Sequence, residues 1–382
     1  WLCCQLGARE HYAVPRALQT RGLLHELITD LWIRPGRLPT WRNKLTGRFH
    51  PDLAGVRVSA PNMAALAFEL KSQATGFHGW DLIAKRNEWF QDHVLVQLER
   101  RASELGDGLV TVFAYSYAAD RIFEFARERG WRTVLGQIDP GPAEERRVAD
   151  STPAPESYWR RWRSACDLAD RILVNSEWSR DALLKEHLPV NKIHVIPLAL
   201  EPGKDAALFN RVYPAAFDAA RPLRVLFLGQ INHRKGAAQL LDAARLLAQA
   251  PVEFWFVGPR QIRTDLRSES KIKWLGAVPR TAVGRFYREA DIFILPTLSD
   301  GFGLTQLEAQ SWKLPVLASR FCGAVVQHGR NGLILDQVAG ESIAATLREL
   351  LESPERLAAM SQESRVSDEF TLKSLASSLT QL

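Results

Sequence analysis

The sequence predicts an α/β protein with two domains, each a doubly wound parallel sheet covered by helices. Its 382 residues are many for one domain and typical of two. Short apolar runs alternate with amphipathic stretches throughout, as strands and helices do in parallel sheets. A polar segment with prolines and a glycine, 201–220, interrupts this alternation, which starts again at Arg224. We therefore place the hinge between the domains in that segment.

The first domain is expected to span residues 1–205. Its strand candidates are short apolar runs, as expected for strands buried on both faces. They are Leu2–Leu6, Leu24–Thr29, Leu109–Tyr115, Thr133–Ile138 and Arg171–Asn175. Helical stretches lie between them, for example Tyr117–Arg129 and Trp178–His187.

The second domain is expected to span residues 206–367. It begins with a strand at Arg224–Leu228, and Lys235–Ala250 has the apolar spacing of a helix. The tail, residues 368–382, has the pattern of a closing helix. Further strands are predicted at Glu253–Val257, Ile272–Leu275, Ile292–Leu295 and Val316–Ala318.

The composition is that of an ordinary globular protein, with 46% hydrophobic and 24% charged residues. No apolar run approaches the roughly 18 residues of a membrane-spanning helix. A formal charge of +6 is too small to indicate nucleic-acid binding by itself. Four cysteines show neither a disulfide framework nor metal-ligand spacing. We therefore expect a cytoplasmic protein without a bound metal and without a nucleic-acid partner.

The opening residues, Trp1–Leu6, are too few for the apolar core of a signal peptide, and no basic segment precedes them. They have the pattern of a first buried strand instead. The chain does not begin with methionine, so we expect a few residues to be absent from its start.

The most informative segment is Pro296–Ala309, where a buried strand is expected to lead into a polar turn and then a helix. Two carboxylates, Asp300 and Glu308, stand on either side of the turn with seven residues between them. The first N–H groups of a helix have no partner within it and lie at the positive end of its dipole. Residues 303–305 therefore predict an anion site suited to a diphosphate. The alternative is an ordinary strand–turn–helix with solvated acids.

A second segment, Gly229–Gly236, follows the first strand of the second domain. It ends in Lys235 and a glycine at the expected start of a helix, which places a cation and free N–H groups beside an anion. Arg234 adds another cation directly before the lysine. The segment is no P-loop, because the Gly-x4-Gly-Lys-Ser/Thr pattern is absent. The alternative is a basic helix start on the surface.

Together the two segments resemble family 4 of the retaining glycosyltransferases, which have the two-domain GT-B fold and share a carboxylate–seven residues–carboxylate motif. The resemblance implies that Glu308 holds the ribose of a UDP- or GDP-type sugar donor and that Asp300 contacts hydroxyls of the donor sugar. Lys235 matches a lysine that binds the donor diphosphate. The resemblance also implies that the closing helix crosses back to the first domain.

The chain departs from the family pattern at several positions. Asp300 is one methylene shorter than the usual glutamate, and Gln230 occupies the position of a diphosphate-binding arginine. Arg234 is expected to supply that charge instead. Lys313 and Ala324 replace a usual glycine and glutamate.

The resemblance places the nucleobase near two strand-end turns, at Gly258 and at Gly276–Val278, although glycines at strand ends are as often only structural. In the first domain, the loop after the first strand is expected to reach across the cleft to the diphosphate. The donor site predicted in this way consists of Gly7, Arg234, Lys235, Gly258, Val278, Asp300, Gly303, Leu304, Thr305 and Glu308.

The family often has a histidine at the end of a first-domain strand, beside the donor sugar, and the corresponding stretch here, Gln137–Gly141, has none. Asp139 either orients the acceptor hydroxyl or caps the turn before Pro-Gly. His11 is an alternative to it. Ser176 is expected to be a helix N-cap rather than a catalytic group. The predicted catalytic residues are Asp300, Lys235, Glu308 and Asp139.

Arginine and tryptophan interleave in two segments, Trp32–Phe49 and Tyr158–Arg163. Cations beside interfacial aromatic side chains favour an anionic membrane surface, whereas the alternative is a solvated basic helix face. With membrane contact, we expect a lipid-linked acceptor and a location at the inner face of the membrane.

The sequence thus predicts a metal-independent, retaining glycosyltransferase without a cofactor. It would move a hexose-type sugar from a nucleotide diphosphate sugar to a hydroxyl of a glycan or lipid-linked acceptor. Two alternatives stay open: another GT-B enzyme such as a sugar-nucleotide epimerase, and a non-catalytic sugar-nucleotide-binding module. A nicotinamide dehydrogenase is disfavoured, because no Gly-x-Gly-x-x-Gly follows a strand.

Overall fold

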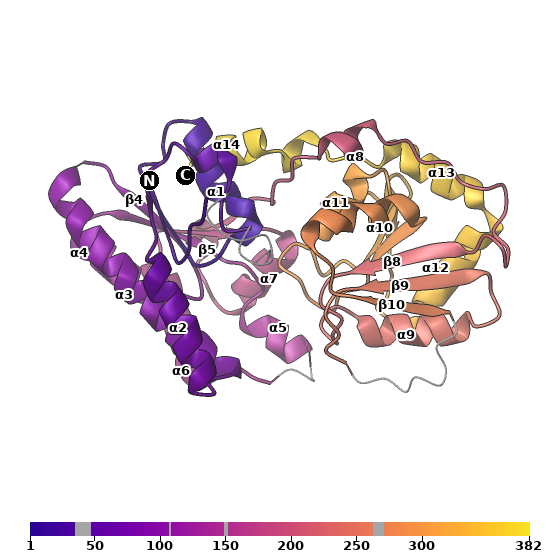
Figure 1. Ribbon diagram of the computed structural model, residues 1–382, viewed down its shortest axis with the longest axis horizontal. Helices are drawn as coiled ribbons and strands as arrows, with labels where there is room; N and C mark the ends of the chain where they lie inside the picture. The colour runs from indigo at the N-terminus through magenta and orange to yellow at the C-terminus, as the bar shows by residue number, and fades with distance from the viewer. Residues whose placement is uncertain (35–46, 107, 149–151, 263–270) are drawn as a thin grey trace.

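The computed structural model describes residues 1–34, 47–106, 108–148, 152–262 and 271–382. Two lobes lie side by side, and each is built around one parallel β-sheet (Figure 1). The first lobe holds the sheet of the N-terminal half, and the second lobe holds that of the C-terminal half.

The first sheet has the strand order β3-β2-β1-β4-β5-β6-β7, and its pairings are parallel. Leu2 and Cys4 of the central strand β1 contribute to one core cluster, and Cys3 contributes to the cluster on the opposite face. The sheet is therefore buried on both faces, as its continuous apolar strands require. Its strands are β1 (Leu2–Gln5), β2 (Glu26–Thr29), β3 (Val58–Ser59), β4 (Thr111–Tyr115), β5 (Arg132–Gly136), β6 (Arg171–Val174) and β7 (Ile193–Val195).

Helices cover the two faces of this sheet. They are α1 (Ala13–Thr20), α2 (Asn62–Ala74), α3 (Gly79–Leu105), α4 (Asp120–Glu128), α5 (Pro142–Arg147), α6 (Glu156–Leu168) and α7 (Glu177–Lys185), with 3₁₀ turns η1 (Arg9–Tyr12), η3 (Pro51–Leu53) and η4 (Val190–Lys192).

The second sheet has the strand order β10-β9-β8-β11-β12-β13, again with parallel pairings. Its strands are β8 (Leu223–Leu228), β9 (Val252–Val257), β10 (Ile272–Gly276), β11 (Ile292–Leu295), β12 (Val316–Ala318) and β13 (Gly332–Ile334). Its helices and 3₁₀ turns are α9 (Ala237–Leu246), η6 (Arg280–Ala282), α10 (Val283–Glu289), α11 (Thr305–Ser311), α12 (Gly340–Glu352) and α13 (Pro354–Glu363), while α8 (Lys204–Leu208) lies in the segment that connects the sheets.

The C-terminal segment returns to the first lobe. After η7 (Asp368–Phe370), helix α14 (Leu372–Thr380) packs beside α1, and the two chain ends lie close together (Figure 1). Leu375 and Leu379 are buried in the same cluster as Leu18, and Arg21 Nη2 donates to Ser377 Oγ over 2.7 Å. The chain therefore crosses between the lobes twice.

The predicted fold class is confirmed, since both halves form doubly wound parallel sheets. Three strands were not predicted: β3, β7 and β13. They have only two or three residues each, and all three lie at sheet edges. Runs this short carry no readable periodicity.

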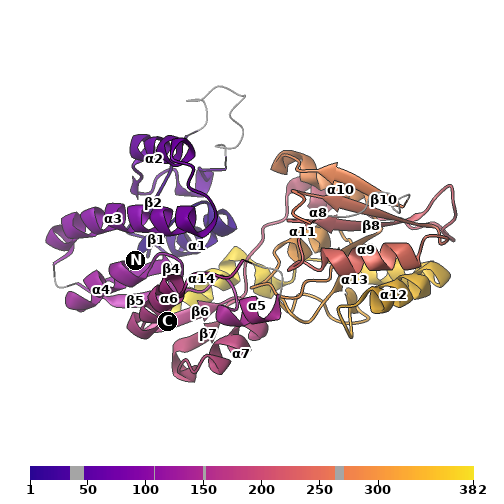
Figure 2. The same cartoon turned by 90° about the horizontal axis from the view of Figure 1, so that it is seen from below.

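Each sheet reverses its direction of winding between two neighbouring strands, β1 and β4 in the first sheet and β8 and β11 in the second. Ligands of doubly wound sheets bind beyond the carboxyl ends of the strands at this point. The loops that follow β8 and β11, 229–236 and 296–304, lie there in the second lobe. Figure 2 shows α5, which follows the loop after β5, at the boundary between the lobes.

Candidate functional site

The loops after β8 and β11 bring together the lysine and the first carboxylate that the sequence singled out. Lys235 Nζ forms an ion pair with Asp300 Oδ2. Only 17% of the Lys235 side chain and 15% of the Asp300 side chain are exposed, so little solvent screens the pair. Burial alone raises the pKa of Asp300, but the charges of Lys235 and Arg234 and an N–H from Phe302 outweigh it and lower the pKa below its ordinary value.

The start of α11 presents three backbone amides. Within the described part of the chain, the N–H groups of Gly303, Leu304 and Thr305 donate no hydrogen bond. Gly303 has φ +79 and lies beside the Asp300 carboxylate. Gly303 and Lys235 therefore lie beside the same carboxylate, at the start of a helix whose first amides are available to a bound anion.

Glu308 lies on α11, in contact with a different partner. Its Oε2 accepts a hydrogen bond of 2.7 Å from the Tyr287 hydroxyl. Burial raises the pKa of Glu308, while the Tyr287 hydroxyl and the charge of Arg280 act in the opposite direction. Glu308 does not touch Lys235; the Asp300 loop and the first turn of α11 connect the two residues.

Backbone packing shapes these loops. A Cβ at Gly236, where φ is +74, would lie 1.8 Å from Pro296 O, and a Cβ at Gly258 would lie 1.8 Å from Gly229 O. Gly258 N–H already donates to Gly276 O. Gly258, predicted to contact the donor, thus holds two strand-end loops together, and Val278 packs against the core beneath the sheet.

Arg234 reaches toward the first lobe. Its Nη1 donates to Ser299 O over 3.1 Å, and its Nε lies 3.5 Å from Glu144 Oε1 on α5. Burial raises the pKa of Glu144 to about 7, although the charge of Arg234 opposes the rise. Arg234 is therefore engaged between the lobes, beside the Lys235–Asp300 pair.

Asp139 lies at the contact between the lobes. A Cβ at Gly301 would lie 2.0 Å from Ile138 O and 3.4 Å from Asp139 Cα, so the turn after Asp300 packs directly on the loop after β5. Asp139 Oδ1 accepts hydrogen bonds from Gly141 N, at 2.8 Å, and Gln137 Nε2, at 3.0 Å. The turn-capping role considered for Asp139 is thus present.

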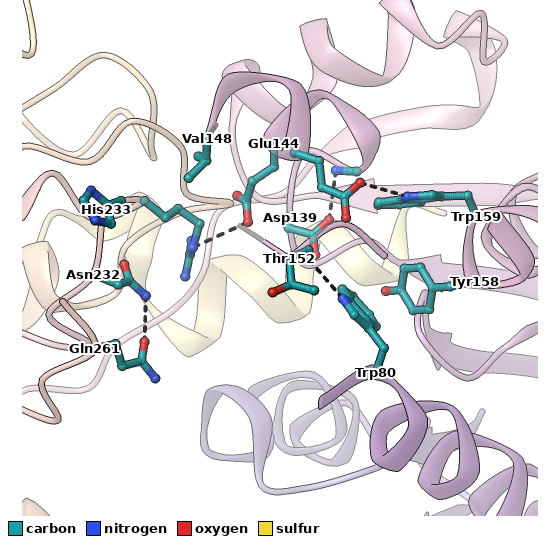
Figure 3. Close-up of a pocket in the computed structure, with 13 residues that line it drawn as sticks. Trp80, Asp139, Glu144, Val148, Thr152, Tyr158, Trp159, Asn232, His233 and Gln261 are labelled. Atoms are coloured by element: carbon teal, nitrogen blue, oxygen red, sulfur yellow. Dashed lines mark hydrogen bonds and ion pairs between the residues drawn. The ribbon is translucent and has the colours of Figure 1, made fainter. Parts of the chain in front are cut away.

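A cavity of ≈ 370 Å³ opens beside this contact (Figure 3). Both lobes line it, with Asp139, Glu144, Trp80 and Tyr158 from the first and Arg234 from the second. Burial raises the pKa of Asp139, against the Gly141 N–H and the charge of Arg234. Lys235, Asp300 and Glu308 do not line this cavity, so the structure places them next to it rather than in its wall.

The loop after β1 has an unusual backbone. Glu10, His11 and Tyr12 have φ of +50, +54 and +60, a left-handed conformation that costs energy for side chains of this kind. Gly7, which lies in the loop expected to reach toward the diphosphate, donates its N–H to Asp30 Oδ1 over 2.8 Å.

His11 connects this loop to the second lobe. Its Nδ1 lies 2.7 Å from Arg280 Nη2, and the charge of Arg280 also acts on Glu308. Burial lowers the pKa of His11 to about 4, with the charges of Arg280 and Arg16 adding to the effect. The neutral imidazole accepts the arginine N–H, so His11 contacts the second lobe through Arg280, on the side of Glu308.

Other predicted residues have clear positions. Ser176 caps α7, since its side chain accepts the Ser179 N–H over 3.1 Å. In the segment Tyr158–Arg163, Trp162 is buried and donates to Gln137 Oε1 over 3.0 Å, and Tyr158 faces the cavity. The aromatic side chains of this segment therefore turn inward. The other arginine–tryptophan segment lies partly outside the described residues.

Two further structural findings concern metals and membranes. Within the described ranges, no group of three or more His, Cys, Asp or Glu side chains is arranged to hold a metal ion. No helix in that same part of the chain is both long and apolar enough to cross a membrane.

Sequence reasoning missed Glu144 and Trp80. Glu144 stands in the first turn of α5 after Pro142, where an acid is expected for helix stability alone. Trp80 opens α3, far along the chain from every motif. Neither position carries a signal in the sequence, because only the packing of α3 and α5 brings them to the cavity.

Comparison with known proteins supports the same family for the second lobe. Residues 222–353 match the family described as glycosyl transferases group 1. The chain is 30% identical over 224 residues to the D-inositol 3-phosphate glycosyltransferase of Thermobispora bispora, covering 51% of each protein. It is 27% identical over 196 residues to the amylovoran biosynthesis glycosyltransferase AmsK of Erwinia amylovora, covering 47% of each. The chain thus spans about half the length of the curated relatives it matches.

Solved structures extend the likeness of fold to the whole chain. The Anabaena protein Alr3699/HepE in complex with UDP superposes with a TM-score of 0.63 at 16% identity, over 100% of this chain and 97% of the other. The sucrose-phosphate synthase of Thermosynechococcus elongatus gives 0.66 at 17% identity, over 96% and 90%. The second lobe thus resembles the group 1 glycosyltransferases in sequence, and the whole chain shares the two-lobed GT-B fold of these solved structures.

Proposed function

We propose that the protein is a retaining, metal-independent glycosyltransferase of family 4. It transfers a hexose-type sugar from a UDP- or GDP-type donor to a hydroxyl of a glycan or lipid-linked acceptor. The observation that carries the proposal is the convergence of Lys235, Asp300 and the unengaged amides of residues 303–305 at one strand-end edge. Relatives named as glycosyltransferases and a neighbour solved with UDP-glucose support it.

The Lys235–Asp300 pair suggests how the site accepts its donor. The donor diphosphate takes over Lys235, which leaves the Asp300 carboxylate to accept a hydrogen bond from a hydroxyl of the donor sugar. Because the pKa of Asp300 is lowered, the carboxylate stays ionised for this role. The ion pair thus keeps both side chains in place for the donor.

The chemical step needs charge stabilisation more than a nucleophile. As the bond between the anomeric carbon and the diphosphate oxygen breaks, negative charge grows on that oxygen. Lys235 and the amides of residues 303–305 bind the growing charge more tightly than they bind the ground state. The acceptor oxygen bonds to the anomeric carbon from the same face, and its proton passes to the departing phosphate oxygen. Metal independence rests on this supply of positive charge by the chain itself.

The decisive experiment compares two lysines of the second lobe. Lys235→Ala should lower the rate of nucleotide release from the productive donor by about 10²–10³, in a panel of UDP- and GDP-sugars. Lys273→Ala is the matched control, because Lys273 also forms an ion pair, with Glu253 at 2.6 Å, but lies away from the site. Equal rates for the two variants would refute the proposal. Metal independence is tested separately: loss of wild-type activity on treatment with EDTA would refute it.

The product distinguishes the alternatives. NMR of the transferred sugar should show the donor's anomeric configuration, as retention requires. A donor that binds in a thermal-shift assay and is neither hydrolysed nor transferred would indicate a binding module. A changed sugar in the recovered nucleotide would indicate an epimerase.

We also propose a cytoplasmic location with contact at the inner membrane face for a lipid-linked acceptor. Exposed arginines of α6 such as Arg160 support it, whereas the inward aromatic side chains do not contribute. A flotation assay with anionic vesicles tests this proposal. If the protein did not associate with the vesicles, the proposed membrane contact would be refuted.

A further inference from the structure

The cavity of ≈ 370 Å³ between the lobes has a wall of two kinds of side chain. The Trp80 and Tyr158 rings lie side by side, with centroids 4.9 Å apart, and Trp159 continues this aromatic wall. Asp139, Glu144 and Glu145 supply three carboxylates. We propose that this cavity binds an uncharged sugar ring of the acceptor and excludes phosphorylated sugars, an inference that rests on the proposed function and names its acceptor class.

The first reason is the position of Asp139. Its loop packs on the turn that follows Asp300, so Asp139 lies between the predicted donor sugar and the cavity. Its Oδ1 is held by Gln137 and Gly141, and Gln137 is fixed in turn by Trp162 Nε1. The other oxygen, Oδ2, accepts no hydrogen bond within the described chain. An oriented carboxylate with a free oxygen suits a hydroxyl donor.

The second reason is the balance of charge. Arg234 is the only arginine or lysine among the described residues of the wall, and Glu144 Oε1 and Ser299 O already engage it. Glu144 Oε2 is buried without a hydrogen-bond partner in the described residues. The described part of the wall therefore offers acceptors, and its one arginine is already engaged. A phosphate carries about −1.5 to −2 charges at neutral pH. It would meet repulsion from the ionised carboxylates of this wall, and Glu144, whose pKa is raised to about 7, joins them mainly above that pH.

The third reason is the aromatic wall. A pyranose ring presents an apolar C–H face and a rim of hydroxyls, which match aromatic faces and carboxylates respectively. In Figure 3, Trp80 and Tyr158 lie on one side of Asp139, and Glu144 lies on the other side. Trp80 is also fixed, because its Nε1 donates to Thr152 O over 3.1 Å. The wall is therefore built for a ring rather than for a flexible chain.

A neighbouring cavity of ≈ 760 Å³ shares Trp80 and Tyr158 with the first. Two of its arginines are paired, Arg48 with Asp30 at 2.9 Å and Arg86 with Glu69 at 2.9 Å. The third, Arg9, lies over the Tyr117 ring with its guanidinium carbon 4.7 Å from the centroid. A phosphorylated acceptor would find a cation at Arg9. Binding of sugar phosphates at that position is therefore the result that would contradict the inference.

The test compares each sugar with its own phosphate, by saturation-transfer NMR on the full chain. Suitable pairs are glucose with glucose 6-phosphate and myo-inositol with D-inositol 3-phosphate, with cellobiose as a longer neutral probe. Neutral members should bind at least about tenfold more tightly than their phosphates. Trp80→Ala should weaken neutral binding by about tenfold, and Trp80→Phe should restore part of it. Trp89→Ala is the matched control for neutral binding, since Trp89 is on the same helix and stacks on Phe68, and it lines the neighbouring cavity but not this one.

Charge removal provides a readout that a merely structural role would not move. At about pH 8, where Glu144 with its pKa of about 7 is mostly ionised, Glu144→Gln should narrow the preference for neutral sugars, because it removes a negative charge and releases Arg234. The inference would be overturned if the sugar phosphates bound more tightly than the neutral sugars, or if their binding were lost in Arg9→Ala. It would also be overturned if the neutral sugars did not bind, or if Trp80→Ala left their binding unchanged. Nucleotide release from the donor panel without an acceptor, and its dependence on Lys235, tests the proposed function separately.

Discussion

The two lobes build their sides of the cleft in different ways. In the second lobe, close backbone contacts set the loops at 229–236 and 296–305, and glycines stand where a Cβ would strike a carbonyl. In the first lobe, side chains from separate helices hold the loop at 137–141, as Trp162 does through Gln137. A site shaped by backbone contacts leaves glycines and fixed spacings in the sequence. A site shaped by side chains from distant helices leaves no such pattern.

The largest expected effect breaks the backbone contact of the second lobe. Gly236→Ala should destabilise the protein by about 3 kcal/mol or more, because its Cβ would lie 1.8 Å from Pro296 O. Gly329→Ala is the matched control, since Gly329 also has positive φ, +77, but has nothing within 4 Å of its Cβ position. It should cost about 1 kcal/mol. Urea denaturation measures both, and equal losses would show that the contact does not matter.

The next effect tests the donor side of the second lobe. Glu308→Gln should raise the KM for the productive nucleotide sugar by about 10- to 100-fold, since a charged hydrogen bond is worth about 1.5–3 kcal/mol. Tyr287→Phe removes only the hydroxyl that orients the Glu308 carboxylate and should raise KM by about threefold. Initial rates at a series of donor concentrations give these KM values. An unchanged KM in Glu308→Gln would refute the expectation that Glu308 holds the ribose of the donor.

A third prediction concerns a buried acid in the first lobe. Burial raises the pKa of Glu10 to about 7, while Arg9 and the Tyr115 hydroxyl act in the opposite direction. Between its ordinary pKa of 4.5 and about 7, the folded chain binds more protons than the unfolded chain, so stability falls as the pH rises through this window. Glu10→Gln removes the penalty. The free energy of unfolding of Glu10→Gln, relative to that of the wild type, should therefore rise by roughly 1–2 kcal/mol from about pH 5 to about pH 8.

Denaturation at the two pH values measures this difference. A Glu10→Gln variant whose stability relative to the wild type is the same at both values would contradict the assignment. A larger gain in stability at the lower pH would show that the pKa of Glu10 is lowered by folding rather than raised.

The smallest effect tests a side-chain contact between the lobes. Trp178 Nε1 donates to Ser299 Oγ over 3.2 Å, while its ring packs on Phe321. Trp178→Phe keeps the packing and loses the hydrogen bond, which should cost about 1 kcal/mol. Ser299→Ala removes the same bond from the other side, so a double-mutant cycle should show coupling of about 0.5–1 kcal/mol. Fully additive losses would exclude a direct contact.

Much of the fold could be predicted because its signals are local. Ile292–Leu295 is apolar over its whole length, and Val252–Val257 is apolar apart from Glu253, as expected for strands buried on both faces. The edge strands β3 and β13 have two and three residues and could not be found. The predicted Lys235 and Asp300 meet because their loops follow adjacent strands. Arg234, expected at the diphosphate, also reaches Glu144 across the cleft, which no local pattern could indicate.

By itself the sequence determined the two parallel sheets, the strand-end loops of the second lobe and the charged side chains of the proposed donor site. The physical reason is that apolar runs, helix starts and glycine positions express constraints between residues close together in the chain. Only the tertiary structure decided the cavity of Trp80, Asp139 and Glu144, because its shape and charge come from packing α3, α5 and α6 against the second lobe.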